Sequence, residues 1–338
     1  GQLYTVGSQY GRVIPPIAQL AWTRSSAFNP IYYNPRVTYP AWSKAYVDGA
    51  TRTYGNQPPA AAPSHPGPLA GTTRTLDVGS DWNSASSGFN DDTYAFTAMK
   101  GMVLPIGTYV ETSGSKACDG SARATTTVIT TADGRCQARI PYFPATYWQR
   151  TVCPTGDAAC VAAPDCVAED PTVNPSASCV ASPDGLGKLR RYEIKTGNTF
   201  PSGRSYTDEL QNFANWFTYY RKRKLLLGGA MGRSLEPITG LRLGVVAFCD
   251  TSDCIAPTMY DADSLNDSQN RLAAAGRFYL NSMAAQGTPT HATMNYVAGQ
   301  FNNNTNIVQY ACQRNSTVVV SDGFSNTASY STPAWDSG

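Results

Sequence analysis

Arg314-Asn315-Ser316-Thr317-Val318-Val319-Val320-Ser321-Asp322-Gly323 contains a short β-branched run that ends in a carboxylate and a glycine. Four β-branched residues in a row, without polar alternation, are typical of a strand buried on both faces, as in a parallel sheet covered by helices. Ligand sites in such sheets lie just past the carboxyl ends of the strands. We therefore expect Asp322 at such an end.

A second oxygen donor is predicted at the same edge. Gly287-Thr288-Pro289-Thr290 opens a helical segment and places the Thr288 hydroxyl near its start. Thr288 and Asp322 together would be two ligands of a hard divalent cation such as Mg²⁺ or Ca²⁺. An Asp-Gly pair is also common in simple turns, and a threonine before proline is a good helix N-cap that needs no metal. From the pattern alone the turn and the cap are favoured, because short motifs are weak signals.

Length and composition exclude several protein classes. The chain has 338 residues, enough for roughly two domains of ordinary size. Charged residues make up 15% and the net charge is +2, which argues against a dedicated nucleic-acid binder. The sequence contains no apolar run of about 18 residues, so no membrane span is predicted. It opens without a signal-peptide pattern, and any leader is expected to be removed or to lie outside this segment.

Nine cysteines and two histidines favour disulfides in an oxidising compartment over a zinc site. Their positions in the sequence predict a bridge between Cys249 and Cys254 and another between Cys118 and Cys136. The four cysteines of residues 151–187 are expected to pair among themselves, in an order that the sequence leaves open. Cys312 is then the unpaired cysteine.

Proline and aromatic residues dominate residues 1–70, which predicts extended chain and turns. Residues 57–68 contain five prolines and are predicted to be an exposed loop or tether. Between residues 71 and 150 we expect short strands, with Trp148 and the Tyr142-Phe143-Pro144 cluster supplying a small core. Residues 151–187 have few large apolar side chains, so their bridges are expected to hold them.

The second half of the sequence has a different pattern. A capping-box-like start at Ser205 and an apolar repeat predict one long helix that ends at Pro237. An apolar strand is expected over residues 241–248 and a helix over residues 268–285. A third helix follows the Gly-Thr-Pro-Thr turn, and the run at residues 318–320 is the next strand. This alternation predicts an α/β domain with a parallel sheet.

Four consecutive basic residues, Arg221-Lys222-Arg223-Lys224, interrupt the long predicted helix. They form either a phosphate-binding patch or a solvated helix face whose side-chain stems cover apolar surface. The small net charge of the chain favours the solvated face.

No catalytic residue is predicted. His65 lies in the proline-rich stretch and His291 in the first turn of a predicted helix, and neither is beside a nucleophile motif. GxSxG and HExxH motifs do not occur in the sequence, so we do not expect an enzyme.

Several blocks together resemble the PilY family of type IV pilus tip and biogenesis proteins. The blocks are Phe28-Asn29-Pro30-Ile31-Tyr32-Tyr33-Asn34-Pro35, Thr38-Tyr39-Pro40-Ala41-Trp42, Tyr142-Phe143-Pro144-Ala145-Thr146-Tyr147, Asn212-Phe213-Ala214-Asn215-Trp216-Phe217-Thr218-Tyr219-Tyr220-Arg221, Gly287-Thr288-Pro289-Thr290, Cys312-Gln313-Arg314-Asn315 and Ser321-Asp322-Gly323. The resemblance implies an α/β von Willebrand factor A-like domain with a large insertion. Residues 1–203 would be mostly insertion, and residues 204–338 would carry the A-domain core.

The resemblance also implies a metal-ion-dependent adhesion site built from an Asp-x-Ser-x-Ser loop, a threonine and an aspartate. Thr288 and Asp322 match the last two positions. The Asp-x-Ser-x-Ser loop does not occur, and the nearest match is Asp250-Thr251-Ser252-Asp253-Cys254. Either the chain begins just after that loop or this member lacks it, and we also expect the last A-domain strands and the family's C-terminal propeller to lie outside the chain.

The function implied by the resemblance is adhesion and pilus assembly at the tip of a type IV pilus. The expected partners are minor pilins and a host or surface receptor, with no nucleic acid. The expected location is extracellular, at the pilus tip, after export through the periplasm. An alternative is a structural, force-transmitting pilus cap that uses no metal.

Overall fold

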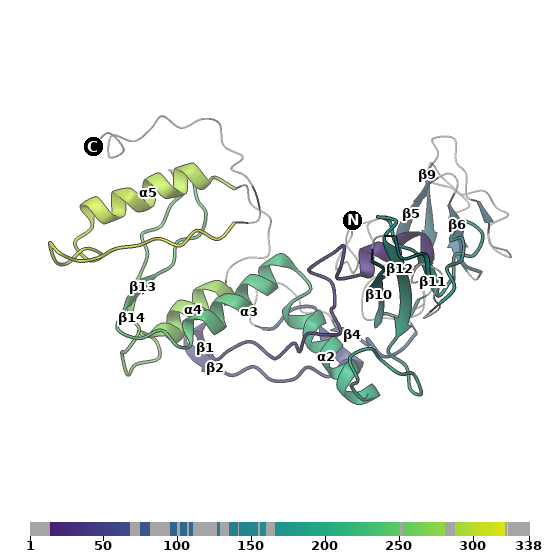
Figure 1. The fold of residues 1–338 in the computed structure, drawn as a ribbon. Coiled ribbons are helices and arrows are strands. Elements are labelled where there is room, and N and C mark those ends of the chain that lie inside the picture. Colours follow the sequence, from purple (N-terminus) through teal and green to yellow (C-terminus); the bar gives the residue numbers. More distant parts are fainter. Residues whose placement is uncertain are drawn as a thin grey trace. The chain divides into compact units, whose positions relative to one another are not determined.

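The structure is a computed structural model that describes residues 14–67, 75–81, 95–99, 102–106, 108–110, 127–128, 135–140, 142–154, 156–159, 166–250, 253–280, 288–321 and 323. The chain forms two compact units (Figure 1). The first comprises Gly1–Ala41, Gly55–Gly67 and Thr72–Leu226, and the second comprises Trp42–Tyr54, Pro68–Gly71 and Leu227–Gly338. These units divide the chain differently from the predicted boundary between residues 203 and 204, which stays a prediction.

Small antiparallel sheets make up much of the first unit. β10, β12 and β11 form one sheet in that order, and β5, β9 and β7 form another; β3 pairs with β4, and β6 with β8. The bounds are β3 Ala62–Pro63, β4 Thr75–Leu76, β5 Ala95–Met99, β6 Val103–Leu104, β7 Tyr109–Val110, β8 Thr127–Val128, β9 Arg135–Arg139, β10 Thr146–Val152, β11 Cys179–Ala181 and β12 Gly187–Glu193.

The 3₁₀ helix η1 (Ala18–Arg24) contributes to two apolar clusters of the first unit. Its Ala18 and Ala21 pack with Trp148 of β10 and Leu189 of β12. Ile17, just before the helix, packs with residues of β5, β6 and β9. Trp148 is 1% exposed, and Tyr142 and Phe143 are also buried, so the predicted small core is confirmed.

Helix α2 (Tyr206–Tyr219) begins where the capping signal predicts. The Ser205 side chain accepts a hydrogen bond from the N–H of Asp208, and two acidic residues occupy the first turn, where the helix dipole favours them. The helix ends at Tyr220, whose backbone is not helical, and α3 (Arg223–Leu235) follows. The prediction of one continuous helix is therefore wrong. The Arg221 side chain donates to the carbonyl of Phe217 at 2.5 Å and so satisfies a carbonyl in the last turn of α2.

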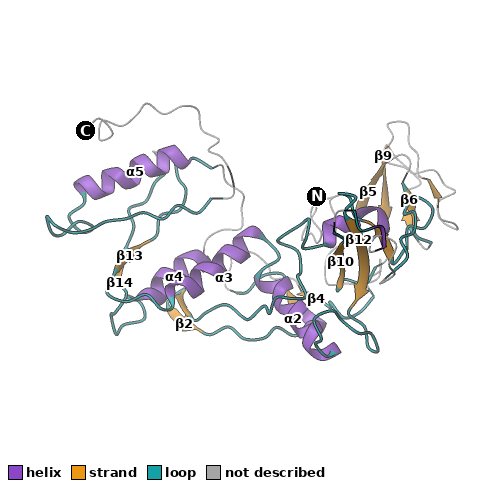
Figure 2. Cartoon of the chain, in the orientation of Figure 1, coloured by secondary structure: helices purple, strands orange, loops and turns teal. Residues whose placement is uncertain are grey.

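Side chains of α2 satisfy the backbone of the extended, proline-rich chain beside it. The Asn212 Oδ1 accepts from the N–H of Tyr39 at 2.7 Å, and its Nδ2 donates to the carbonyl of Val37 at 2.9 Å. The Asn215 Nδ2 donates to the carbonyl of Tyr39 at 3.0 Å, and its Oδ1 accepts from the N–H of Gln57 at 2.9 Å. Much of the chain that borders α2 is loop (Figure 2). The side-chain amides therefore supply the hydrogen bonds that a neighbouring strand would supply in a sheet. We call Asn212 and Asn215 the amide clamp.

Aromatic residues fill the space between α2 and the segment that it holds. Tyr33 is 1% exposed and packs within 6 Å, centroid to centroid, of Phe213 and Trp216. The Trp216 Nε1 donates to the carbonyl of Ile31 at 2.9 Å. Such pairs stabilise a core by roughly 0.5–1.5 kcal/mol each beyond their buried area.

The prediction of an exposed loop or tether at residues 57–68 is only partly confirmed over the described residues, because Pro58, Ala60, Ala61 and Gly67 are exposed but the chain between them is packed against α2. Gln57 is bonded to Asn215, and the chain continues into a 3₁₀ helix, η2 (Pro59–Ala61), and then β3. Ala62 is fully buried and Ser64 is 3% exposed. The prolines mark extended chain, as expected, but α2 packs against part of that chain.

The second unit pairs short strands with helices. Its elements are β1 Ala45–Val47, β2 Ala50–Arg52, β13 Arg242–Gly244, β14 Met259–Asp261, α4 Arg271–Leu280 and α5 Thr290–Asn303, together with most of α3. α4 packs closely on β1, because a Cβ at Gly276 would lie 1.9 Å from the carbonyl oxygen of Tyr46. The Trp42 and Tyr279 rings stack with centroids 4.3 Å apart.

The strand predicted at Val318–Val320 is not formed. These residues lie outside any strand and are 83%, 45% and 46% exposed. The strand predicted over residues 241–248 is limited to β13, which pairs antiparallel with β14. All strand pairs among the described residues are antiparallel, so the chain is mixed α/β, but the predicted parallel sheet is not seen there. A buried strand needs a neighbouring ladder for its N–H and C=O groups, and residues 318–320 lie beside none in the described part of the chain.

Candidate functional site

One of the two predicted metal ligands, Thr288, lies just before α5. Thr288 is partly buried, and its carbonyl accepts from the N–H of Thr290 at 2.8 Å. The N-cap of α5 is Pro289 and not Thr288, and it makes no side-chain cap. Asp322 lies outside the described residues, so the expected pairing of Thr288 with Asp322 stays a prediction.

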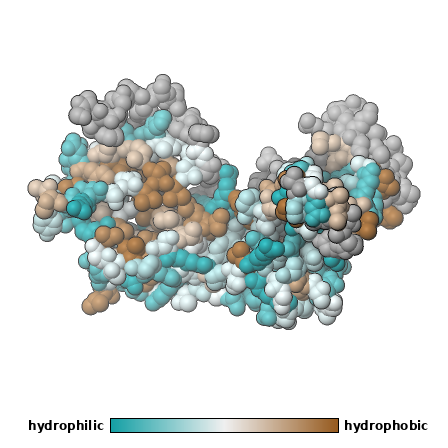
Figure 3. Space-filling model, viewed as in Figure 1, coloured by the Kyte–Doolittle hydropathy of each residue, from teal (hydrophilic) through white to brown (hydrophobic). Residues whose placement is uncertain are grey.

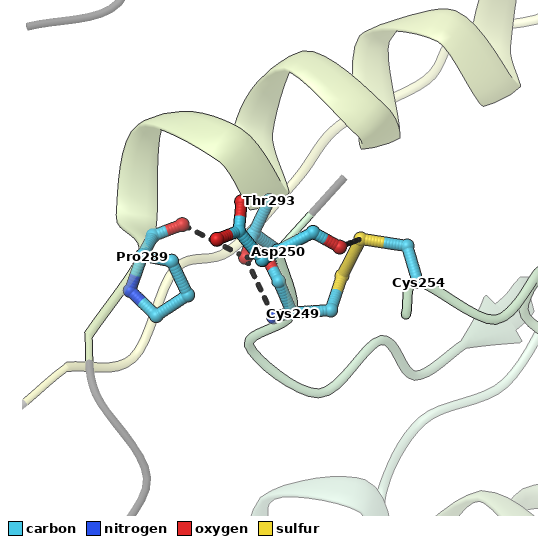
Figure 4. The surroundings of a disulfide bond; sticks show 5 residues. All are labelled: Cys249, Asp250, Cys254, Pro289 and Thr293. Atoms are coloured by element: carbon cyan, nitrogen blue, oxygen red, sulfur yellow. Dashed lines mark hydrogen bonds between the residues drawn. A yellow bond between two sulfur atoms is a disulfide. The ribbon is translucent and has the colours of Figure 1, made fainter. Parts of the chain in front are cut away.

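A disulfide loop is fixed to the first turn of α5 through Thr293 (Figure 4). The Thr293 Oγ1 accepts a hydrogen bond from the N–H of Cys249 at 3.0 Å. Its own hydroxyl hydrogen has two acceptors within reach, the carbonyl oxygens of Cys249 and Pro289, each at 3.0 Å. Thr293 is 5% exposed. The Thr293 hydroxyl thus connects Cys249 to α5. In the sequence, the position of Thr293 about one helical turn after Thr290 is the only signal of this role.

Cys249 and Cys254 form the predicted disulfide, with Cα atoms 5.0 Å apart. The carbonyl of Asp250 lies 3.0 Å from the Cys254 Sγ. Asp250 is exposed and lies beside the first turn of α5 (Figure 4). Asp250, the first residue of the nearest match to Asp-x-Ser-x-Ser in the sequence, therefore lies next to the helix that follows Thr288.

The donor set at this place is incomplete for a divalent cation. Asp250 offers one carboxylate, and the Thr290 hydroxyl oxygen is buried without a hydrogen-bond partner. Within the part of the chain that the structure describes, no three His, Cys, Asp or Glu side chains come together as metal ligands. Mg²⁺ and Ca²⁺ require about six oxygens and usually more than one carboxylate. The described residues alone do not fit such an ion.

The remaining cysteines agree with the disulfide prediction where they are described. Cys166 is bonded to Cys179, and Cys153 is also disulfide-bonded. Cys312 is free and exposed, as predicted. Cys118 lies outside the described residues, so its expected bridge to Cys136 stays a prediction.

Glu209 on α2 is a fully buried carboxylate of the first unit, with 0% of its surface exposed. Arg204 donates to its Oε2 at 3.2 Å, Ser202 donates to the same oxygen at 2.7 Å, and Tyr147 donates to Oε1 at 3.4 Å. Burial raises the pKa of Tyr147 above its usual value, and the Glu209 charge adds to the shift. Glu209 is satisfied within the protein, so this cluster holds the fold and leaves no group poised for chemistry.

The two histidines lie in different units. His65 is partly buried, with its Nδ1 3.3 Å from the carbonyl oxygen of Pro66, and burial lowers its pKa. His291 is exposed in the first turn of α5. We assign neither histidine to a catalytic site.

Comparisons with protein-family models, curated proteins and solved structures found no match to this chain. None of the helices over the described residues has the length and apolar character needed to cross a membrane.

Proposed function

We propose that this chain is a type IV pilus tip factor that acts in adhesion and pilus assembly. In this role it contacts minor pilins, presents a surface for attachment to a host or other surface, and is extracellular after export through the periplasm. We further infer that residues 204–338 belong to a von Willebrand factor A-like fold. The proposal starts from the blocks that resemble the PilY family.

One observation carries the proposal. Three of those blocks meet in the structure: the amide clamp and Trp216 bond the block at residues 212–221 to the blocks at residues 28–35 and 38–42, which are far from it in the sequence. The side chains that make these bonds are among the residues that define the resemblance. Because the blocks bond to one another, each needs the others for its hydrogen bonds. This supports the interpretation that they belong to one structural unit and are not a chance match of short motifs.

A metal-dependent version of this role needs ligands that the described residues do not supply. The fold brings Asp250 to the helix that follows Thr288, and a resident ion would then require Asp322 and oxygens beyond the described residues.

The test is binding of this chain to purified minor pilins, measured by surface plasmon resonance with Mg²⁺ and with a chelator. The variants are Asp322→Asn and Asp250→Asn, with Asp48→Asn as the control because Asp48 is an exposed turn residue. Metal-dependent pilin binding that both site variants weaken and the control does not would support metal-dependent adhesion. An absence of pilin binding in every condition would refute the pilus role.

A second role is a structural pilus cap that transmits force and uses no metal. The incomplete donor set among the described residues favours it, as do the disulfides that brace the chain. Pilin binding that is the same with Mg²⁺ and with a chelator, and that Asp322→Asn leaves unchanged, would select this role.

A further inference from the structure

The β-branched run that follows α5 has the composition of a strand, but no strand pairs with it among the described residues. Val318, Val319 and Val320 are 83%, 45% and 46% exposed. Residues 316–320 belong to no helix or strand, and within the part of the chain that the structure describes their backbone groups make no hydrogen bond. Exposed β-branched side chains beside open N–H and C=O groups are the features of an unpaired strand. The segment is therefore available for pairing.

The backbone of this segment selects an extended polypeptide as its partner. N–H and C=O groups alternate along an extended chain, and a second extended chain presents the matching alternation. A helix has already used its own backbone groups, and an apolar ligand without polar atoms would cover the valines but leave the backbone unsatisfied. The partner that fits is another strand.

The sequence around the valines is complementary to itself in the antiparallel direction. Arg314 lies four residues before Val318 and Asp322 lies four residues after it, and no charged residue lies between them. When two copies of the segment pair antiparallel with Val318 opposite Val318, Arg314 of each copy lies opposite Asp322 of the other. Asp322 lies outside the described residues, so its contribution is that of its charge in the sequence.

The charges match in one register only. Because side chains alternate between the two faces of a strand, a symmetric antiparallel pair changes its register in steps of two residues. In the two neighbouring registers Arg314 lies opposite Phe324 or Val320, and no opposite charges face each other. Opposite charges on neighbouring strands stabilise the pairing, and like charges destabilise it. Two ion pairs, one at each end, therefore favour the register centred on Val318.

We propose that residues 314–322 are an interaction surface for a second copy of this chain, and that the two segments pair as antiparallel strands centred on Val318. The same segment is used by both copies, so the assembly closes at two. A two-stranded ribbon alone is marginal in water, so the dimer forms in a concentration-dependent way. The inference goes beyond the proposed pilus role and does not rest on it. A metal ion bound by Asp322 would compete with the dimer.

The test is sedimentation velocity over about a hundredfold range of protein concentration. All proteins carry Cys312→Ser, because an exposed free thiol close to the segment can link two copies covalently. We expect a monomer–dimer equilibrium. Arg314→Asp should raise its dissociation constant about tenfold, because both ion pairs become repulsive, and Asp322→Arg should do the same.

Reversing both charges distinguishes pairing from an unrelated effect of either change. The double variant Arg314→Asp with Asp322→Arg should dimerise within about threefold of the parent, because its ion pairs are restored in reverse. An equimolar mixture of the two single variants should form a mixed dimer, since each segment then meets one of opposite charge. Damage to the fold would be reversed neither in the double variant nor in the mixture.

Two further variants complete the test. Arg36→Asp reverses an exposed charge in the first unit and should change the dissociation constant less than about twofold. Val319→Pro should abolish the dimer, because proline removes a backbone donor from the strand. Val319 is exposed, so this variant is expected to fold, and circular dichroism checks this. A monomer at every concentration overturns the proposal, as does a dimer that Val319→Pro leaves unchanged or a loss that the double charge reversal does not restore.

Discussion

The Asn212 side-chain oxygen accepts a hydrogen bond from the backbone N–H of Tyr39 at 2.7 Å, across 173 residues of sequence. Asn215, one turn later in α2, bonds the carbonyl of the same tyrosine. Tyr39 therefore has both of its backbone polar groups satisfied by one helix. The arrangement explains how a segment rich in proline stays extended and covered without a strand partner.

Replacing Asn215 by leucine should destabilise the first unit by about 2–4 kcal/mol. The change leaves the partly buried carbonyl of Tyr39 and N–H of Gln57 without these partners, and unsatisfied groups are costly. Urea unfolding followed by tryptophan fluorescence measures the loss. Asn198→Ala is the control, because Asn198 makes an exposed hydrogen bond, and a loss below about 0.5 kcal/mol is expected. Equal effects of the two changes would show that the amide clamp does not carry stability.

Replacing Glu209 by glutamine should cost roughly 2–4 kcal/mol, because Arg204 then loses the charge of its buried partner. Glu236→Gln removes an exposed carboxylate on the same chain and should have almost no effect. Thermal unfolding of both variants beside the parent chain gives the comparison. A stable Glu209→Gln protein would mean that hydrogen bonds, and not the charge, are what Glu209 supplies.

Lys222→Met should stabilise the protein at neutral pH by roughly 1–3 kcal/mol. The pKa of Lys222 is lowered to about 8 in the folded protein, below the usual value of about 10.4 in an unfolded chain. Between these values the unfolded chain binds more protons, so the stability that this group controls rises with pH. The advantage of Lys222→Met is therefore full below about pH 8 and disappears above about pH 10.4. Urea unfolding across this range measures it, and an advantage that is constant with pH would contradict the assignment.

Replacing each of two helical glycines of the second unit by alanine should change the stability of the protein in opposite directions. At Gly276 a Cβ would lie 1.9 Å from the Tyr46 carbonyl oxygen, so Gly276→Ala should separate α4 from β1 and cost about 2 kcal/mol or more. At Gly299 in α5 a Cβ would meet nothing within 4 Å, and alanine should stabilise the helix by roughly 0.5–1 kcal/mol. Melting temperatures of the two variants test both signs. A neutral Gly276→Ala change would show that the two elements can separate without loss.

Breaking the Cys249–Cys254 bridge by replacing both residues with serine should cost roughly 2 kcal/mol, since the closed loop is short. The loss should be local, because Thr293 connects the loop to α5. Hydrogen exchange, read by mass spectrometry, should rise over residues 249–254 and the first turn of α5. Cys312→Ser, which removes an exposed free thiol, is the control and should leave the exchange pattern unchanged.

Local signals in the sequence predict local structure well. The cap at Ser205, the core around Trp148 and the Cys249–Cys254 bridge are each encoded by a few neighbouring residues, and each is present. Failures occur where the outcome depends on distant partners. Residues 318–320 have strand character but no ladder among the described residues, and residues 57–67 have the composition of a tether but are bonded to α2 and partly buried.

The candidate site shows the same limit. Sequence reasoning identified Thr288 and the Asp250 loop separately, and the structure places Asp250 beside the helix that follows Thr288. The link is Thr293, a threonine inside a helix, where its residue type carries no special signal. Figure 3 shows apolar surface that is open to solvent on this face of the second unit. The exposed apolar residues of that unit include Leu241, Ile255 and Val318, and a pattern that assigns apolar residues to the core does not predict their exposure.

The amide clamp also has a consequence for the synthesis of the chain. Tyr39 leaves the ribosome long before Asn212, the partner 173 residues downstream, has been made. During that interval the tyrosine- and proline-rich segment has no cover and must stay extended and unaggregated on its own. Prolines suit this waiting period, because they hold the chain open and resist strand pairing. The segment's composition therefore serves the nascent chain as well as the finished fold.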